Sequence, residues 1–376
     1  MEAKKGSKHV HQCLSLLVAS LMFAVGLAGC ESHTSVPLRN DLITFSDKFL
    51  DVAYVTGSTF VVVGYNGRIL RTEDGGKSWQ ESFSDPAKNT RFTEYTLNQV
   101  EFVGEHGWAV GHRGTILHSR DGGKTWTKQQ VDTEKTIFGV SFVDPLHGRA
   151  SGDESTFLST DNGGETWNVQ RIEVSDVGLT EETRLAVPDV IYYTIDFVDP
   201  QNGWMAGEFG NIRHTSDGGK TWDSQHGALL DELVAKGKAP ARDVMLMGAF
   251  FRVNFTDLKH GVAVGASGAI AVTDDGGQSW RWISREGDNA EVPALHIYGF
   301  APAGQNGMVS AVGANGAVLT SKNGGLNWQP AKVNFGVFTW INGVAFGDQG
   351  KGVLVGGRGI VLRTEDAGQT WNPIGG

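Results

Sequence analysis

An eight-residue pattern recurs seven times along the chain and constrains the fold more than any other feature. Each copy begins with Ser or Thr, has Asp or Asn two residues later and Gly four residues later, and ends in Trp. Its acidic or amide residue and its Trp are, in order, Asp74 and Trp79, Asp121 and Trp126, Asn162 and Trp167, Asp217 and Trp222, Asp275 and Trp280, Asn323 and Trp328, and Asp366 and Trp371. Successive Trp residues lie 41 to 58 residues apart. A period of this length, with a turn and a Trp in each copy, predicts a β-propeller with one copy per blade.

The residues of this pattern, here called the Asp-box, are those that close a tight hairpin. A short Asp or Asn side chain accepts hydrogen bonds from nearby backbone N–H groups, and the Ser or Thr hydroxyl can make another. Gly allows a backbone conformation closed to other residues, and Trp can bury a large ring between blades. The spacing differs from that of an EF-hand loop, so we interpret the Asp-boxes as structural and predict neither a metal nor a cofactor.

The segments between the Asp-boxes predict four antiparallel strands per blade. An innermost strand that ends in an aromatic residue comes first, as in Val140–Phe142 and Ile195–Phe197. Its apolar residues lie two apart, as a half-buried strand requires. A second strand such as Trp108–Gly111 and a third such as Thr115–Leu117 follow, and the Asp-box joins the third strand to the fourth. The 376-residue chain therefore predicts an all-β, seven-bladed propeller over residues 41–376.

This strand order sorts the loops onto two faces. The Asp-boxes and the turns between first and second strands share one face, here called the box face. The turns between second and third strands and the links between blades lie on the other, the connection face, where binding loops are free to vary. The candidate partner-binding residues, on that face or in the channel, are Tyr65, His112, Arg113, Glu208, Arg252 and Arg358. Their Arg residues could bind an acidic peptide, and the alternative is that they are solvated turn residues.

Two links between blades are long, residues 168–190 and 223–243. The second contains Leu229–Lys236, whose helical spacing and following Gly237 predict a helix at about 228–238. It could cover the rim of the domain or act as a lid or partner contact. The chain ends soon after Trp371, so we predict that Asp41–Phe45 supplies or extends the outer strand of the last blade.

The N-terminus is predicted to be a targeting segment. Residues 1–29 combine three lysines with an apolar run that is short for a membrane span, and they end in small residues before Cys30. This arrangement resembles a bacterial lipoprotein box, which implies cleavage before Cys30, lipid on Cys30 and a tether over residues 30–40. An ordinary signal peptide or an uncleaved anchor is the alternative. We expect a lipid-anchored protein of the cell envelope that faces the periplasm, at the outer membrane.

The charge of the chain bears on its partners. The net charge is −10 and no basic stripe is evident, which argues against nucleic acid as a partner. His112, His118 and His214 do not have the spacing of metal ligands. The expected partner is a membrane protein or its assembly intermediate, bound by a monomer.

The repeats resemble the photosystem II stability/assembly factor family, one group among the propellers with sialidase-type Asp-boxes. Residues 107–111 and 114–126 carry the resemblance most clearly, and it extends over roughly Leu50–Trp371. The resemblance implies a non-catalytic scaffold that docks on a membrane protein complex and aids its assembly or stability. In a cell without photosynthesis, we expect an accessory role at an envelope transporter.

Two other functions remain open at this point. A sialidase-like glycoside hydrolase would need three Arg, a Tyr–Glu pair and an Asp on the connection face. The Arg-Ile-Pro string typical of sialidases is missing near the start, and the nearest string, Phe251–Asn254, lies in mid-chain. A propeller that binds a sugar or another small ligand is the other alternative. We predict that the chain is not an enzyme.

Overall fold

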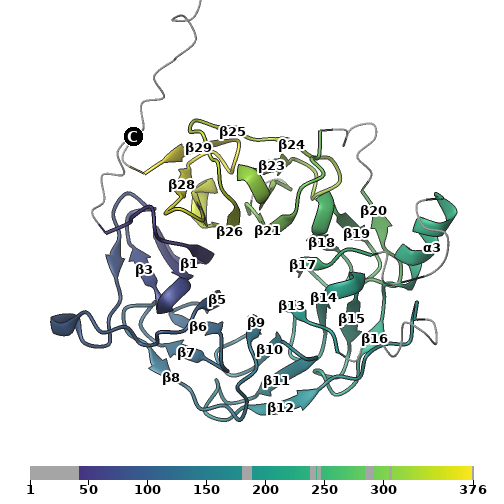
Figure 1. Ribbon diagram of the computed structural model, residues 1–376, viewed down its shortest axis with the longest axis horizontal. Coiled ribbons are helices and arrows are strands. Elements are labelled where there is room, and N and C mark those ends of the chain that lie inside the picture. Colours follow the sequence, from purple (N-terminus) through teal and green to yellow (C-terminus); the bar gives the residue numbers. More distant parts are fainter. Residues whose placement is uncertain are drawn as a thin grey trace, which may run out of the picture. The chain divides into compact units, whose positions relative to one another are not determined.

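The computed structural model describes residues 42–179, 189–237, 243, 247–283, 289, 291–304 and 307–374. The predicted signal peptide, Cys30, the tether and Asp41 lie outside the described residues. Seven sheets, each built from strands consecutive in the chain, are arranged as a ring (Figure 1), and we use the word channel for the region around the axis of this ring. The predicted seven-bladed propeller with four-stranded blades is therefore confirmed. Within the described ranges, no helix is both long enough and apolar enough to span a bilayer.

The strands of the blades run in chain order from the channel outwards. Blades 1 and 2 consist of β1 (Phe49–Thr56), β2 (Thr59–Gly64), β3 (Ile69–Thr72) and β4 (Gln80–Glu81), then β5 (Leu97–Val103), β6 (His106–Gly111), β7 (Ile116–Ser119) and β8 (Thr127–Lys128). Blades 3 and 4 consist of β9 (Ile137–Phe142), β10 (Gly148–Gly152), β11 (Thr156–Thr160) and β12 (Asn168–Arg171), then β13 (Tyr192–Phe197), β14 (Gly203–Gly207), β15 (Ile212–Thr215) and β16 (Asp223–Ser224).

The remaining blades follow the same order. Blades 5 and 6 consist of β17 (Phe250–Phe255), β18 (Gly261–Gly265), β19 (Ile270–Thr273) and β20 (Arg281–Trp282), then β21 (Ile297–Pro302), β22 (Val309–Gly313), β23 (Val318–Ser321) and β24 (Gln329–Pro330). Blade 7 consists of β26 (Ile341–Phe346), β27 (Gly352–Gly356), β28 (Val361–Thr364) and β29 (Thr370–Pro373), with β25 (Lys332–Val333) parallel to β29. Short 3-10 turns are η1 (Tyr65–Gly67), η2 (Pro86–Lys88), η3 (Glu208–Gly210), η5 (Ala266–Gly268), η7 (Ala314–Gly316) and η8 (Asp348–Gly350).

The Asp-boxes form the hairpins between third and fourth strands. In blade 1, Asp74 Oδ1 accepts hydrogen bonds from the backbone N–H groups of Lys77 and Ser78, both at 2.9 Å. Thr72 Oγ1 accepts from the N–H of Gly76 at 3.0 Å. The Gly at this position has φ between +84° and +94° in all seven copies, a region that favours glycine. The first Gly of the box, Gly75, donates to Ser58 O in the turn between β1 and β2, so these turns share the box face as predicted.

Every innermost strand begins with a β-bulge. At this start, the pairing register between first and second strands skips one residue in each of the seven blades, and blade 1 has a second shift between Tyr54 and Thr56. The residues skipped at the start are Leu50, Asn98, Phe138, Tyr193, Phe251, Tyr298 and Asn342. A bulge redirects the extra side chain out of the regular alternation. It follows that seven equivalent side chains are set apart at the start of the strands that line the channel.

In blades 2 to 5, side chains of the preceding blade accept hydrogen bonds from the inner edge of the innermost strand. An innermost strand has unpaired N–H groups on its channel side, and such groups are costly if left without partners. Gln99 Oε1 of blade 2 accepts from the N–H of Val140 in blade 3 at 3.0 Å, and Asp196 Oδ2 of blade 4 accepts from that of Phe255 in blade 5 at 2.6 Å. These polar side chains on the innermost strands therefore have a structural role, which is to bind backbone N–H groups of the next blade.

Blades 2 and 4 each pack on the next blade through a large aromatic side chain of the second strand. Trp204 is fully buried, stacks on Phe255 of blade 5 with ring centroids 3.5 Å apart, and donates its indole N–H to Gly276 O at 3.1 Å. Trp108 packs on Phe142 of blade 3 in the same manner. Each pair joins one blade to the next.

The ring closes differently from the prediction for Asp41–Phe45. Residues 42–46 are turns rather than a strand, and the outer strand of blade 7 is β29, supplied by the C-terminal segment itself. Its outer edge pairs with β25 and not with the N-terminal segment, because the link before blade 7 already runs along that edge. Ile43 instead inserts its side chain into the apolar cluster shared by blades 1 and 7, where Val361 and Ile374 also lie.

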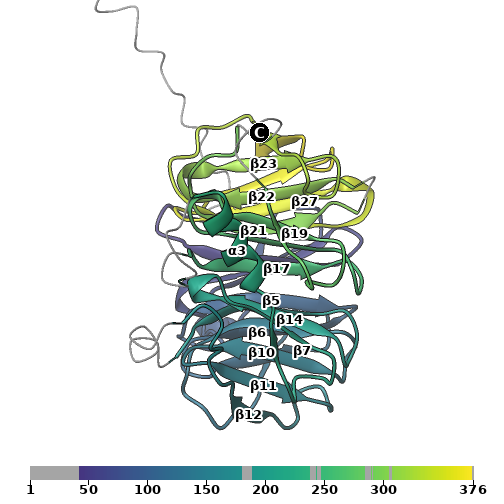
Figure 2. The same cartoon turned by 90° about the vertical axis from the view of Figure 1, so that its right-hand side faces the viewer.

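The predicted helix is present as α3 (Gly227–Ala235) and lies at the outer rim beside β20 in Figure 1, with Figure 2 viewing that rim directly. Leu229 and Leu230 are buried, and Leu229 O accepts from the indole N–H of Trp282 at 3.2 Å. The helix ends before 238 because Gly237 has φ +65°. These contacts correspond to the rim-covering alternative.

Candidate functional site

The turns between second and third strands have one geometry in all seven blades. The first turn residue donates its N–H to the carbonyl just before the innermost strand, as from His112 to Thr96 O at 3.0 Å. The second turn residue is left-handed, with φ between +49° and +58°, although it is never Gly: Asn66, Arg113, Glu154, Phe209, Ser267, Asn315 and Arg358. Such backbone conformations cost about 1–2 kcal/mol per residue and concentrate at functional surfaces. The candidates Tyr65, His112, Arg113, Glu208 and Arg358 occupy these first two positions.

Cation–aromatic pairs occupy three consecutive blades of the connection face. In blade 1 the Lys48 ammonium lies 5.0 Å from the centre of the Tyr65 ring. In blade 2 the Arg113 guanidinium lies 5.6 Å from that of Tyr95, and in blade 7 the Arg358 guanidinium lies 5.3 Å from that of Phe45. Exposed pairs of this kind contribute about 0.5–1 kcal/mol each. Blades 7, 1 and 2 therefore present exposed positive charge beside aromatic rings.

Aromatic side chains occupy the bulge positions of the next four blades. Phe138, Tyr193, Phe251 and Tyr298 come from blades 3, 4, 5 and 6, and we call this set the aromatic arc. Neighbouring ring centroids are 5.4 to 5.5 Å apart, and all four side chains are half-buried. Burial, together with nearby Glu208 and Asp153, raises the pKa of Tyr193 to about 12. The aromatic arc follows the channel mouth on the connection face and offers ring edges and faces to a ligand.

Arg252 lies in the channel and not with the other candidates. Its Nη2 donates to Asp51 Oδ1 at 3.1 Å and so links blade 5 to blade 1 across the ring. The carboxylates of Glu101 and Asp196 lie near this pair. Burial and the Asp196 charge raise the pKa of Glu101 well above its usual range, and burial raises the pKa of Asp196 to about 6. The guanidinium of Arg252 is therefore held by an internal charge cluster.

The other predicted residues differ in whether their side chains already have partners within the protein. Glu208 Oε2 accepts from the N–H of Ile191 at 3.0 Å, so its carboxylate holds the turn against the innermost strand. Arg113 is exposed, and its nearest acidic partner, Glu134, lies 3.9 Å away at the surface. His112 and Arg358 are exposed as well. The structure thus brings Arg113, Arg358, His112 and Tyr65 to one side of the face and separates them from Arg252.

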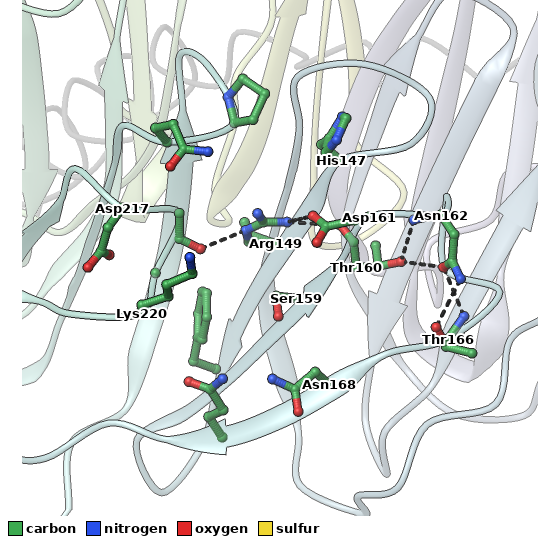
Figure 3. Close-up of a pocket in the computed structure, with 16 residues that line it drawn as sticks. His147, Arg149, Ser159, Thr160, Asp161, Asn162, Thr166, Asn168, Asp217 and Lys220 are labelled. Carbon is green, nitrogen blue, oxygen red and sulfur yellow. Dashed lines mark hydrogen bonds and ion pairs between the residues drawn. The ribbon is translucent and has the colours of Figure 1, made fainter.

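A polar pocket of about 630 Å³ lies between blades 3 and 4 on the box face (Figure 3). Blade 3 has Arg149 and Ser159 as cross-strand neighbours where blade 4 has Trp204 and His214. The smaller Ser and the slender Arg leave the space that Trp and His fill in blades 2 and 4. Arg149 Nε donates to Gly218 O at 3.0 Å, equivalent to the indole bond of Trp204. The residue at the centre of this pocket therefore has a structural role in joining blades.

The aromatic arc is the feature that sequence reasoning missed. Its signal is a break in alternation: two adjacent aromatic residues begin the innermost strands at Tyr192 and Tyr193 and at Phe250 and Phe251. In a regular strand the two side chains of each pair would point to opposite faces of the sheet, so both could not be buried on the same face. The bulge resolves this conflict by burying the first side chain completely and turning the second toward the channel mouth.

Comparison with known proteins places these features in a family. The model of the family described as "Photosynthesis system II assembly factor YCF48" matches residues 31–132, 125–189 and 241–335. The "Photosystem II assembly lipoprotein Ycf48" of a Prochlorococcus marinus strain is 30% identical over 93 residues, which are 23% of this chain and 26% of the relative. That of a Synechococcus strain is 34% identical over 99 residues, 24% of this chain and 28% of the relative. The chain thus matches about a quarter of the length of these curated relatives.

A solved structure shows the same fold over most of the chain. The structure "YCF48 bound to D1 peptide" superposes with a TM-score of 0.61 and 19% identity, and covers 85% of this chain and 93% of that one. Both curated relatives are named lipoproteins, which agrees with membrane anchoring by lipid. Their names give no support to a role at an envelope transporter or to the outer membrane. The family model covers more than half of the chain, and the chain belongs to the photosystem II assembly factor YCF48 family.

Proposed function

We propose that this chain is a docking propeller without catalytic activity, which binds an exposed peptide segment of a membrane protein while that protein is assembled. Membership of the YCF48 family supports this function. The observation that carries it is the composition of the connection face. Exposed cations on blades 7, 1 and 2 and the aromatic arc on blades 3 to 6 surround one channel mouth.

This arrangement suits an extended peptide with a negative group and an apolar side chain. The guanidinium group of Arg113, on the blade next to the aromatic arc, can bind a carboxylate in bidentate fashion. The half-buried rings of Tyr193 and Phe251 can contact an apolar side chain without large rearrangement. Charge would then fix the direction of the peptide, and burial against the rings would supply most of the affinity.

The client that we propose is the D1 protein or its counterpart in the host. The support is the solved relative, which is described as bound to a D1 peptide. A protein without catalytic activity also fits the state of the Asp-box carboxylates. Burial alone would raise the pKa of Asp217, but hydrogen bonds from Thr221 and Thr215 lower this pKa to about 2. The Asp217 carboxylate is therefore occupied by hydrogen bonds within its own hairpin.

Binding of labelled D1 peptides, measured by fluorescence anisotropy, tests this function. The double substitution Tyr193→Ala and Phe251→Ala is expected to weaken binding of the responsive peptide at least about tenfold, since each buried aromatic contact contributes more than about 1 kcal/mol. The matched control is Leu146→Ala and Leu258→Ala on the box face, where both side chains are about half exposed. It should leave the affinity unchanged within about twofold.

The outcome that contradicts the proposal is equally definite. A set of peptides covering all exposed segments of D1 with no binding to the wild-type protein would rule out this client. An equal loss of peptide affinity in the box-face control would rule out the connection face as the specific binding site. Circular dichroism of both double variants separates a loss of binding from a loss of folding.

A further inference from the structure

Exposed aromatic side chains gather at one corner of the connection face. Phe338 and Phe45 are 79% and 70% exposed, more than any other large hydrophobic side chain in the described ranges. Tyr65 is exposed as well. Isolated surface apolar residues need no explanation, but neighbouring exposed aromatic rings indicate a binding surface.

Backbone contacts place the segments that carry Phe338 and Phe45 on either side of one turn. They flank Gly357–Gly359, the turn between second and third strands of blade 7. Gly357 donates its N–H to the carbonyl of Trp340, two residues after Phe338, at 3.0 Å. Gly359 donates to the carbonyl of Asp47, two residues after Phe45, at 2.8 Å. The corner lies where blade 1 meets blade 7, at the purple and yellow ends of the ring in Figure 1.

The charge at this corner is positive although the chain is acidic overall. Arg358 lies over the Phe45 ring, and Lys48 lies over the Tyr65 ring. The adjacent acidic residue, Asp47, is neutralised by Arg68, whose Nε lies 3.3 Å from Asp47 Oδ1. Two cations among exposed rings thus stand out in a chain with net charge −10.

The chain length limits how far this corner can be from the predicted lipid anchor. Cys30 precedes Leu42 by 12 residues. An extended chain spans at most about 3.5 Å per residue, so 12 residues give the predicted tether a reach of at most roughly 40 Å. Leu42 O accepts a hydrogen bond from Arg68 at the edge of the same corner. The predicted tether is therefore short enough for this corner to contact the membrane that holds the anchor.

We propose that Phe45, Lys48, Tyr65, Phe338 and Arg358 form a membrane-facing patch that rests on the headgroup layer of the anionic bilayer holding the lipid anchor. Aromatic rings favour the interface between headgroups and acyl chains. Lys and Arg side chains are attracted by anionic lipids, roughly fivefold in affinity per cation. The connection face then points toward the membrane, where segments of a membrane protein emerge. This inference needs no protein client and stands without the proposed function.

Site-specific quenching on vesicles tests the orientation. The sequence has only Cys13 and Cys30, the first expected to leave with the signal peptide and the second to be blocked by lipid. A single fluorophore can therefore be placed by Ser46→Cys beside the patch or by Leu146→Cys on the box face. The lipidated protein is bound to vesicles of phosphatidylcholine with about a third phosphatidylglycerol and a headgroup spin label. Quenching at position 46 is expected to be at least roughly threefold stronger than at position 146.

A second comparison separates contact from mere tethering. Lys48→Gln with Arg358→Gln removes both cations and leaves the tether unchanged, so quenching at position 46 should fall toward the value at position 146. Equal quenching at positions 46 and 146 in the unsubstituted background would overturn the orientation. Quenching at position 46 that is insensitive to the double substitution would overturn contact with the anionic surface. Because no client protein is present, either result leaves peptide docking to be decided by its own assay.

Discussion

Replacing Trp204 by Ala is expected to lower the free energy of unfolding by about 3–5 kcal/mol. The indole ring is 1% exposed, stacks on Phe255 of the next blade and lies nearly parallel to it. Ala would leave a cavity between two blades and would remove the hydrogen bond to Gly276 O. The measurement is chemical denaturation followed by circular dichroism.

Trp222→Ala is the matched control for this substitution. Trp222 belongs to the Asp-box of the same blade and donates to Gly219 O within its own hairpin at 3.1 Å, but its ring is only half-buried. We expect a clearly smaller loss than for Trp204, because less apolar surface is removed from the interior. Equal losses would contradict the conclusion that second-strand aromatic rings join the blades.

The second large effect concerns pH and the channel carboxylates. Asp196→Asn is expected to gain stability relative to the wild type by up to about 3 kcal/mol between pH 4 and pH 8. Burial raises the pKa of Asp196 to about 6, against opposing hydrogen bonds from Phe255 N and Asn254 and the Arg252 charge. The folded state therefore binds a proton that the unfolded state has released, and the wild type loses this stability as pH rises from about 4 to 6. Asn cannot ionise and avoids the loss.

The difference between variant and wild type isolates this effect from an opposing one. Burial, with the charges of Arg120 and His106, lowers the pKa of His118 to about 4. The free energy of unfolding that depends on neutral His118 is therefore lost as pH falls below 6.5. This contribution is common to both proteins and cancels. Although burial would raise it, the pKa of Asp217 is lowered to about 2 by hydrogen bonds from Thr221 and Thr215, which do not titrate, so the control Asp217→Asn should show a constant difference over the same range. A constant difference for Asp196→Asn as well would contradict the buried channel cluster.

The blade count and the strand order could be predicted because the Asp-box has strict local chemistry. Asp74 and Thr72 bind backbone N–H groups within their own hairpin, so the pattern is visible in any window that contains it. The assignment of turns to two faces followed from the alternation of antiparallel strands. Arg113 and Arg358 could be assigned to equivalent turns because these turns occupy the same place in each repeat.

The features that escaped prediction depend on contacts between distant residues. The N-terminal segment buries Ile43 against blade 7, while β25 occupies the strand edge that this segment was expected to cover. Arg252 was correctly assigned to an innermost strand, but its partner Asp51 is 201 residues away and lies across the channel. The helix α3 was predicted within a few residues because its signal is local.

Photo-crosslinking in native membranes tests the central claim most directly, namely that clients bind the connection face and that the box face is structural. A photoreactive phenylalanine is placed at Phe251 of the aromatic arc and, in a second protein, at Leu258 on the box face of the same blade. The docking function predicts a covalent adduct with one membrane protein from position 251 and none from position 258. Adducts that form from position 258 and not from position 251 would contradict it.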